Sequence, residues 1–204
     1  MKELVEAKGI DFVWHFTRLS NLPGILANGL INRVQLTFSG MPWEFNDHYR
    51  IDGQQDSICC SIAHPNYKMF YRLRQENPDT EWVVIGLKPF VLWEKDCAFC
   101  VSNAASDEVT AIPIQNRKGP AAFNRLFEEF PGKPTRAELG ISNGCPTNPQ
   151  AEVLVFGNIE TNYIIGAVTQ KKETAESLKG QYPNFQFVYH KALFSARKDY
   201  EHWK

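Results

Sequence analysis

The segment "HFTRLSNLPGILANGL", residues 15–30, joins a strand-forming sequence to a helix-forming one. The strand begins upstream, in the short apolar and β-rich run "IDFVWHFT" at 10–17. The helix is predicted over 20–30, where Ser20 or Asn21 can cap its start, Pro23 suits its first turn and Gly29 can end it. The segment therefore predicts a buried strand that turns directly into a short helix.

Further strands and helices follow this unit without regular alternation. Strands are expected at 57–63, 81–89, 149–155, 162–170 and 184–190, and helices at 66–75, 119–130, 171–180 and in the C-terminal tail. Two long stretches are predicted to be loops, which at this length are often functional. The stretch 32–56 is polar and aromatic-bearing, with two glycines, one proline and weak periodicity, and the stretch 131–151 is rich in Pro, Gly and Asn. The pattern indicates the α+β class rather than a doubly wound parallel sheet.

Length, charge and cysteine content narrow the class of protein. The chain has 204 residues, 43% hydrophobic and 22% charged, which suggests one domain over 1–204. A net charge of −1 argues against a protein that coats duplex DNA, so any nucleic-acid contact should be local or made to a short single strand. The sequence shows no apolar run long enough to span a membrane, and residues 1–12 lack the apolar run that a signal peptide needs, so neither kind of segment is expected. Its five cysteines do not form a disulfide pattern, so a cytoplasmic location is expected.

Several familiar chemical motifs are absent from the sequence. It contains neither G-x-G-x-x-G, nor the Walker A pattern, nor G-x-S-x-G. Cys97 and Cys100 have the spacing of half a zinc site, but a structural zinc needs four ligands, and only Cys145 and scattered histidines could complete it. The interpretation we favour is two thiols in an apolar strand, with no metal.

Three polar positions remain, and each has a structural alternative. Glu152 opens the apolar run "EVLVF" and shares a strand face with Gln150, and it is either a solvated edge residue or a carboxylate aimed at a substrate. His15 shares a face with Thr17, although a histidine in a strand is often simply hydrogen-bonded in the core. Arg50 is either a surface guanidinium or a fork for a phosphate or a base edge.

Two aromatic residues and several cations complete the set of candidates. Tyr71, in the predicted helix 66–75, is a possible stacking residue, whereas Phe70 is more typical of a core. Lys68, Arg72 and Arg74, or Lys171 and Lys172, are candidate local contacts to nucleic acid, and half or more of such charges are usually only solvated.

The motif "H-x-T-x-x-x-N-L-x-x-I-L-x-x-G-L" at 15–30, together with a late Q-x-E, resembles the ADP-ribosyltransferase superfamily and most closely the DarT family of bacterial DNA ADP-ribosyltransferase toxins. "PNYKMFY" (65–71) is similar to the second element of that family, and "PQAEVLV" (149–155) to its catalytic strand. The resemblance covers most of the chain. It implies a split, mixed β-sheet core flanked by helices.

The resemblance also implies a function and a set of roles. The chain would be a bacterial toxin that uses NAD as co-substrate and attaches ADP-ribose to a base of single-stranded DNA, with release of nicotinamide. His15, Thr17 and Asn21 would bind NAD, Glu152 would be the catalytic glutamate and Arg50 the site arginine. Beside these roles, Tyr71 is expected to bind NAD and Gln150 to contact the base, from their side-chain chemistry.

The resemblance leaves the acceptor and the partner as expectations. The motif "S-I-x-x-P-N-Y-K-M-F-Y" (61–71) is more similar to the guanine-modifying group of the family than to the thymine-modifying group, which favours guanine as the acceptor base. A partner with an ADP-ribose-removing macrodomain is expected to neutralise the toxin. Transfer to RNA or protein, and a non-catalytic nucleic-acid-binding module of the same fold, are the alternatives.

Overall fold

A computed structural model describes residues 1–40, 43–45 and 52–204 of the chain. Its helices are α1 (Lys2–Lys8), α2 (Leu22–Asn28), α3 (Arg33–Ser39), α4 (Tyr67–Glu76), α5 (Val91–Glu94), α6 (Asp107–Thr110), α7 (Gly119–Arg125), α8 (Arg136–Leu139) and α9 (Lys172–Gln181). Its strands are β1 (Val13–Arg18), β2 (Ser57–Ile62), β3 (Trp82–Leu87), β4 (Cys97–Cys100), β5 (Glu152–Phe156), β6 (Ile164–Thr169) and β7 (Gln186–Tyr189). No helix among the described residues is both long enough and apolar enough to cross a membrane.

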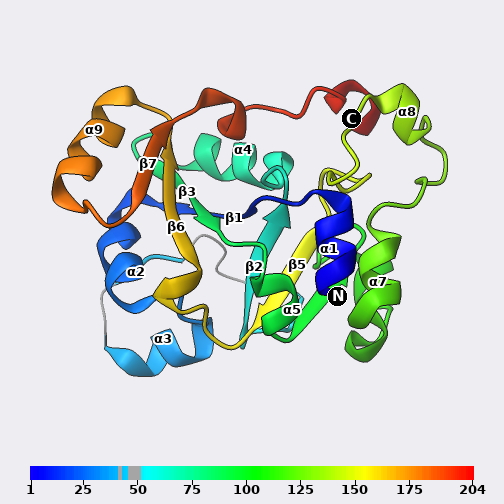
Figure 1. The fold of residues 1–204 in the computed structure, drawn as a ribbon, viewed down its shortest axis with the longest axis horizontal. Helices are drawn as coiled ribbons and strands as arrows, with labels where there is room; N and C mark the ends of the chain where they lie inside the picture. Colours follow the sequence, from blue (N-terminus) through cyan, green and yellow to red (C-terminus); the bar gives the residue numbers. More distant parts are fainter. Residues whose placement is uncertain (41–42, 46–51) are drawn as a thin grey trace.

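The described strands form one mixed sheet in the order β4-β5-β2-β1-β3-β6-β7. Neighbouring strands are antiparallel except β6 and β7, which are parallel and connected through α9. In Figure 1, α9 lies beside β7 at one end of the molecule, and α7 lies at the opposite end, beyond the β5 side of the sheet. The α+β class and the mixed sheet with flanking helices are confirmed.

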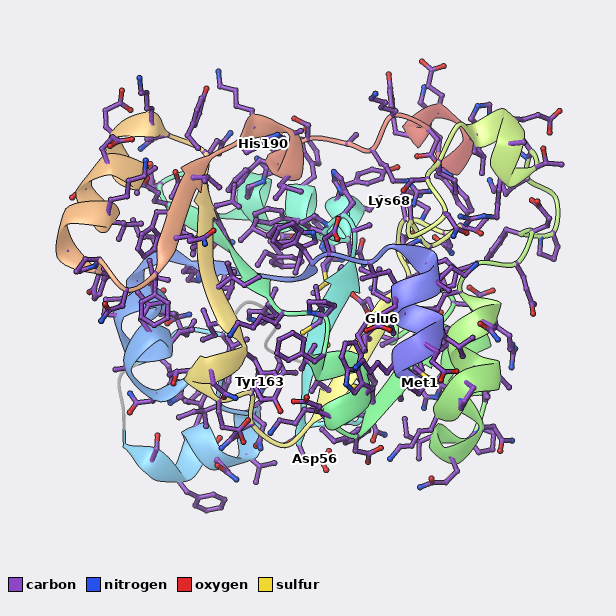
Figure 2. All side chains as sticks on the ribbon, viewed as in Figure 1. Met1, Glu6, Asp56, Lys68, Tyr163 and His190 are labelled. Atoms are coloured by element: carbon purple, nitrogen blue, oxygen red, sulfur yellow. The ribbon has the colours of Figure 1, made fainter. Side chains whose placement is uncertain are left out.

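Alternating side chains give the sheet two apolar faces, as the period of a β-strand requires. Val13, Ile85 and Leu87 belong to the larger core cluster, which also includes residues of α1, α2, α5 and α7. The opposite face carries a smaller aromatic cluster in which Phe70 of α4 packs on Phe16 at 4.5 Å between ring centroids and on Phe194 of the C-terminal tail at 5.5 Å. Figure 2 shows the side chains of both faces on the ribbon.

The strand-to-helix unit at 15–30 folds largely as its sequence predicts. β1 covers Val13–Arg18, α2 has Pro23 in its first turn, and Gly29 ends it with a φ of 83°. A Cβ at Gly29 would lie 2.3 Å from the carbonyl oxygen of Ile159, because Leu30 pairs there with Ile159. Glycine is therefore required both by the backbone conformation and by the close approach.

Two expectations about this part of the chain were wrong. Asn21 occupies the N-cap position of α2, but neither its side chain nor that of Ser20 caps the helix, because both bond to Glu44 instead. The stretch 32–56, predicted to be a loop, contains α3, which is capped by Asn32 through the N–H of Gln35 at 3.0 Å. Its β-branched residues hid this helix, whereas Asn32 and Gly40 were its visible boundaries.

Candidate NAD and nucleic-acid site

The candidate site begins at a split between β1 and β2. Among the described residues these strands pair only through Val13 with Ile62 and Trp14 with Ser61, although β1 pairs with β3 along its whole length. Beyond Trp14 the strands separate, and the His15 side chain crosses the gap to donate from Nδ1 to the carbonyl oxygen of Cys59 at 2.8 Å. The split sheet that the resemblance implies is therefore present.

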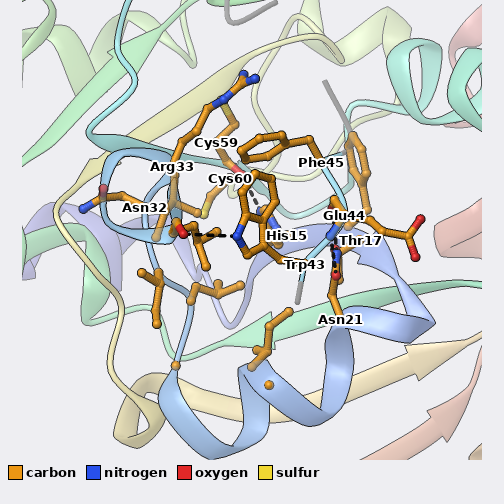
Figure 3. A pocket seen from close by; sticks show the side chains of 18 of the residues that line it. His15, Thr17, Asn21, Asn32, Arg33, Trp43, Glu44, Phe45, Cys59 and Cys60 are labelled. Carbon is orange, nitrogen blue, oxygen red and sulfur yellow. Dashed lines mark hydrogen bonds between the residues drawn. The ribbon is translucent and has the colours of Figure 1, made fainter. Parts of the chain in front are cut away.

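A pocket of about 450 Å³ opens at this split. Such a volume lies within the range of typical small-molecule sites. Its walls come from β1, α2, α3, the segment 43–45, β2, α4 and the start of β5, and they include His15, Thr17, Asn21, Met69 and Glu152. Figure 3 shows His15, Thr17 and Asn21 in this pocket with Cys59 and Cys60 of β2. The structure thus brings the first motif and the late glutamate, 137 positions apart from His15 to Glu152 (152 − 15), into one site.

Glu152 is buried at 5% exposure and held from two sides. The Asn66 side-chain amide donates to Oε1 at 3.1 Å, and the backbone N–H of Ala104 donates to Oε2 at 2.8 Å. A buried carboxylate without such donors would cost several kcal/mol. Glu152 is therefore an oriented buried group rather than a solvated edge residue.

The polar residues of the first motif form a connected set. Thr17 is buried, and its hydroxyl oxygen accepts from the Asn21 amide at 3.0 Å. The same amide nitrogen donates to the backbone carbonyl oxygen of Glu44 at 2.9 Å, and the side-chain Oδ1 of Asn21 accepts from the Glu44 backbone N–H at 3.0 Å. Asn21 therefore links the strand to the segment 43–45.

The segment 43–45 contributes two aromatic rings and a carboxylate to the pocket wall. Trp43 donates from Nε1 to the carbonyl oxygen of Leu36 at 3.1 Å, and its ring lies 3.6 Å from that of Phe45 between centroids. The Arg33 guanidinium of α3 lies 3.9 Å from the centre of the Phe45 ring (Figure 3). Glu44 accepts from Ser20 at 2.9 Å and lies 3.4 Å from Arg18 Nη1. Aromatic faces of this kind are suited to stacking a base.

Not every predicted site residue is brought into the pocket. Gln150 is half-buried and precedes β5, and Tyr71 of α4 is 58% exposed. Neither residue is among the described residues that line the pocket, and the α4 residue that does line it is Met69. Helical spacing explains this, because Met69 and Tyr71 are about 200° apart around α4. Arg50 lies outside the described residues.

The loop before Glu152 is fastened to the C-terminal tail. The buried guanidinium of Arg197 donates to the carbonyl oxygens of Pro146 at 2.7 Å and Thr147 at 2.6 Å, and it pairs with Asp199. Trp203 donates to the same carboxylate at 2.8 Å. Burial acts to raise the pKa of Asp199, but Arg197 and Trp203 outweigh it and hold that pKa below its usual value.

The candidate basic residues are spread over the surface rather than gathered at the pocket. Lys68 lies on the α4 side of the molecule (Figure 2). Arg72 faces Glu76 at 3.7 Å, Arg74 bonds to the carbonyl of Phe194, and Lys171 lies 3.5 Å from Glu81. Lys172 begins α9 and is exposed. Three of these five cations therefore have protein partners.

The thiols are separate and largely buried. No disulfide joins any of the five cysteines, all of which lie in the described ranges, and within the described part no three His, Cys, Asp or Glu side chains gather as a metal site. Burial raises the pKa of Cys97 to about 12, with a smaller contribution from Asp96, and raises that of Cys100 to about 11. Cys59 is half-buried and lines the pocket.

Sequence reasoning did not select four residues of the site. Three of them line the pocket (Trp43, Glu44 and Met69), and the fourth, Asn66, holds Glu152. "PNYKMFY" contains Asn66 just before an amphipathic helix, so its position as a helix cap was visible, but its contact with a carboxylate 86 residues away was not. The polar and aromatic composition of 32–56 was the available signal for Trp43 and Glu44.

The fold is similar to that of solved DarT and DarTG structures. The chain matches "Thermosipho africanus DarTG in complex with ADP-ribose" with a TM-score of 0.62 and 17% identity, covering 90% of this chain and 51% of that one. It matches "Thermus sp. 2.9 DarT in complex with NAD+" with a TM-score of 0.54 and 14% identity, over 91% of this chain and 98% of that one. It also matches "Thermus sp. 2.9 DarT in complex with ADP-ribosylated ssDNA" with a TM-score of 0.57 and 15% identity, over 92% and 97%. The chain thus spans about half the length of the Thermosipho protein, and at these identities the likeness defines the fold.

The family follows from the sequence match. Residues 14–199 match the family described as "ssDNA thymidine ADP-ribosyltransferase, DarT". The chain belongs to the DarT family. A comparison with curated proteins found no match to the chain.

Proposed function

We propose that this chain binds NAD in the pocket at the β1–β2 split and transfers its ADP-ribose to a base of single-stranded DNA, releasing nicotinamide. The observation that carries the proposal is the buried, doubly held Glu152 carboxyl in the same pocket as His15, Thr17 and Asn21. The Thermus relative has been seen with NAD+ and with ADP-ribosylated single-stranded DNA, which supports both substrates.

The residues suit a displacement at the ribose carbon C1′. The bond from C1′ to nicotinamide breaks and nicotinamide leaves with the electron pair, so positive charge develops on the ribose. A fixed carboxylate stabilises that charge where it forms, and Glu152 has this role in the proposal. The base nitrogen then bonds to C1′, and its proton passes to Glu152 or to water. His15 and Thr17 hold the adenosine ribose, while Arg50 and Gln150 position the DNA.

We propose guanine as the acceptor base. The proposal rests on the similarity of the motif at 61–71 to the guanine-modifying group, whereas the description of the family names thymidine. Both bases present an N–H that becomes a nucleophile on losing its proton, so the same carboxylate serves either one. The choice of base is therefore a separate question from the choice of reaction.

The test is incubation of the protein with NAD and single-stranded oligonucleotides, followed by mass spectrometry. Oligonucleotides that contain guanine but no thymine, and thymine but no guanine, separate the bases, and RNA and protein pools test other acceptors. ADP-ribose on the guanine strand alone is the expected result, and Glu152→Gln is the matched control. Product on RNA or protein alone, or binding of DNA without any NAD consumption, would contradict the proposed reaction.

We also propose that residues 1–204 act as one catalytic domain whose toxicity needs a neutralising partner with an ADP-ribose-removing macrodomain. The Thermosipho relative, named DarTG and bound to ADP-ribose, is about twice as long as the matched region, which supports a second part of this kind. Co-expression with an ADP-ribose-removing macrodomain that acts on DNA should restore growth. Equal toxicity with and without that macrodomain would argue against such a partner.

A further inference from the structure

Asn66 lies at the junction of three structural elements and is completely buried, at 0% exposure. Its backbone N–H donates to the Ser61 hydroxyl at 3.1 Å. Its side-chain oxygen accepts from the Met69 N–H at 3.3 Å and so caps α4, while its side-chain nitrogen donates to Glu152 at 3.1 Å. The side chain of Asn66 therefore joins α4 to β5, and its backbone N–H joins the same residue to β2.

The two ends of the Asn66 amide are not interchangeable. The helix start offers an N–H, which needs the oxygen, and the Glu152 carboxyl needs the nitrogen. A 180° flip would set donor against donor and acceptor against acceptor in a buried place, where an unmet polar group costs about 1–3 kcal/mol. The helix cap thus determines which end of the amide faces Glu152.

Capping alone does not require asparagine. Ser, Thr and Asp cap helices about as well, but among these four residue types only asparagine also presents an N–H beyond the capping oxygen. The Ala104 N–H holds the other carboxyl oxygen at 2.8 Å, so the plane of the carboxyl is set by donors on two sides. Asn66 itself does not line the pocket among the described residues, so it acts through Glu152.

We propose that Asn66 is a positioning residue that aims the Glu152 carboxyl at the ribose of the bound dinucleotide. This inference rests on the proposed function and deepens it. The proposal includes α4 in the catalytic geometry, because the Asn66 side-chain amide bonds both to the first turn of α4 and to the Glu152 carboxyl. A misdirected carboxylate lowers the rate of transfer more than it lowers NAD binding, because its role is in the transition state.

The test compares two substitutions that keep the cap and lose the donor. Asn66→Ser supplies a capping oxygen without charge, and Asn66→Asp supplies one together with a second carboxyl beside Glu152. Asn124→Asp makes the same chemical change at an exposed position of α7 and is the matched control. Thermal unfolding of each variant sets a common assay temperature below all of their transitions.

We expect Asn66→Ser to lower kcat by about 10- to 100-fold, with KM for NAD changed less than about threefold. Asn66→Asp should lower kcat further at neutral pH and move the acid limb of its pH–rate profile upward, because neighbouring carboxyls share a proton. Asn124→Asp should match the parent. Parent-like kcat and pH profiles in both Asn66 variants would reduce Asn66 to a helix cap and overturn the proposal.

A second measurement does not depend on turnover. In protein labelled with ¹³C-glutamate, with Glu152→Gln assigning the signal, the Glu152 carboxyl should titrate at a higher pH in Asn66→Asp than in the parent. An unchanged titration would overturn the positioning role even if the variants were inactive. A parent protein that neither consumes NAD nor modifies DNA would instead refute the proposed function, so the two failures are distinguishable. If Asn66→Asp fails to fold, Asn66→Ser decides the outcome, because it adds no charge. In that variant the Glu152 carboxyl should also titrate at a higher pH than in the parent, and kcat should fall.

Discussion

Glu44 and Glu152 line the same pocket in opposite environments. Glu152 is 5% exposed and held by donors from β2–α4 and from the chain after β4, whereas the Glu44 side chain is 56% exposed and held by Ser20 and Arg18 at the surface. A buried carboxyl with fixed donors cannot move without losing several kcal/mol, while an exposed ion pair is worth about 0–1 kcal/mol. The pocket therefore has one wall suited to catalysis and one that can adjust to a ligand.

The largest effect should come from the rigid wall. Glu152→Gln keeps the size of the side chain but removes its charge and turns one oxygen into a donor that faces either Asn66 or the Ala104 N–H. Transfer should fall by at least about 10²-fold, the scale expected for a positioned catalytic group. Steady-state kinetics with a labelled oligonucleotide measures this. Activity within tenfold of the parent would contradict the role of Glu152.

His15 lies at the boundary between the two walls and should have the next largest effect. His15→Ala removes the hydrogen bond to Cys59 across the split, together with a ring that lines the pocket. A loss on the scale of one hydrogen bond corresponds to about a tenfold weaker affinity for NAD. Isothermal titration with NAD measures it, and a change smaller than twofold would remove His15 from the NAD site.

The adjustable wall should respond weakly. Glu44→Gln removes the ion pair with Arg18 but keeps the backbone bonds to Asn21. We expect a KM for NAD within about fivefold of the parent, and a free energy of unfolding within about 1 kcal/mol, because exposed ion pairs contribute little. Raising the salt concentration should lower activity less in Glu44→Gln than in the parent. A loss of kcat as large as that of Glu152→Gln would show that both walls are equally rigid.

Thiol labelling can show which residues are reached from the pocket. Cys97 and Cys100 have pKa values of about 12 and about 11, so their thiolate fractions at pH 8 are on the order of 10⁻⁴ and 10⁻³ and both should react slowly. Cys59, in contrast, lines the pocket and can be reached from it. A small alkylating reagent should modify Cys59 first, and NAD should slow that reaction. Labelling of Cys100 should rise about tenfold per pH unit up to about pH 11 while the fold persists. Mass spectrometry after digestion identifies the sites, and equal labelling with and without NAD would oppose the proposed location of the dinucleotide.

The smallest effect is expected at Tyr71. This residue is 58% exposed on α4 and does not line the pocket among the described residues. Tyr71→Ala should leave KM for NAD within twofold of the parent. A several-fold rise would instead support the cofactor-binding role predicted for Tyr71 from the sequence.

Much of the sheet could be predicted from residue patterns. Short apolar runs marked β1, β2, β3 and β5 to within a few residues, because a buried strand must present apolar side chains on both faces. The helix α3 was missed because Val34 and Thr37 are poor helix formers. Its cap at Asn32 is a local signal, and the weak periodicity of the polar, aromatic-bearing stretch around it obscures that signal. The C-terminal tail, expected to be helical, forms only short 3₁₀ turns at Lys191–Phe194 and Tyr200–Trp203.

The order of residues along the chain by itself determined the strand-to-helix unit at 15–30, the apolar strand that begins at Glu152 and the resemblance to the DarT family, since each is carried by neighbours in sequence. Tertiary structure alone decided that Asn66 holds Glu152, that Asn21 bonds to Glu44 rather than capping α2, and that Tyr71 is directed to solvent. The physical reason is distance along the chain. Capping and side-chain period are local, whereas the donor that satisfies a buried carboxyl can come from any segment that the fold brings within about 3 Å.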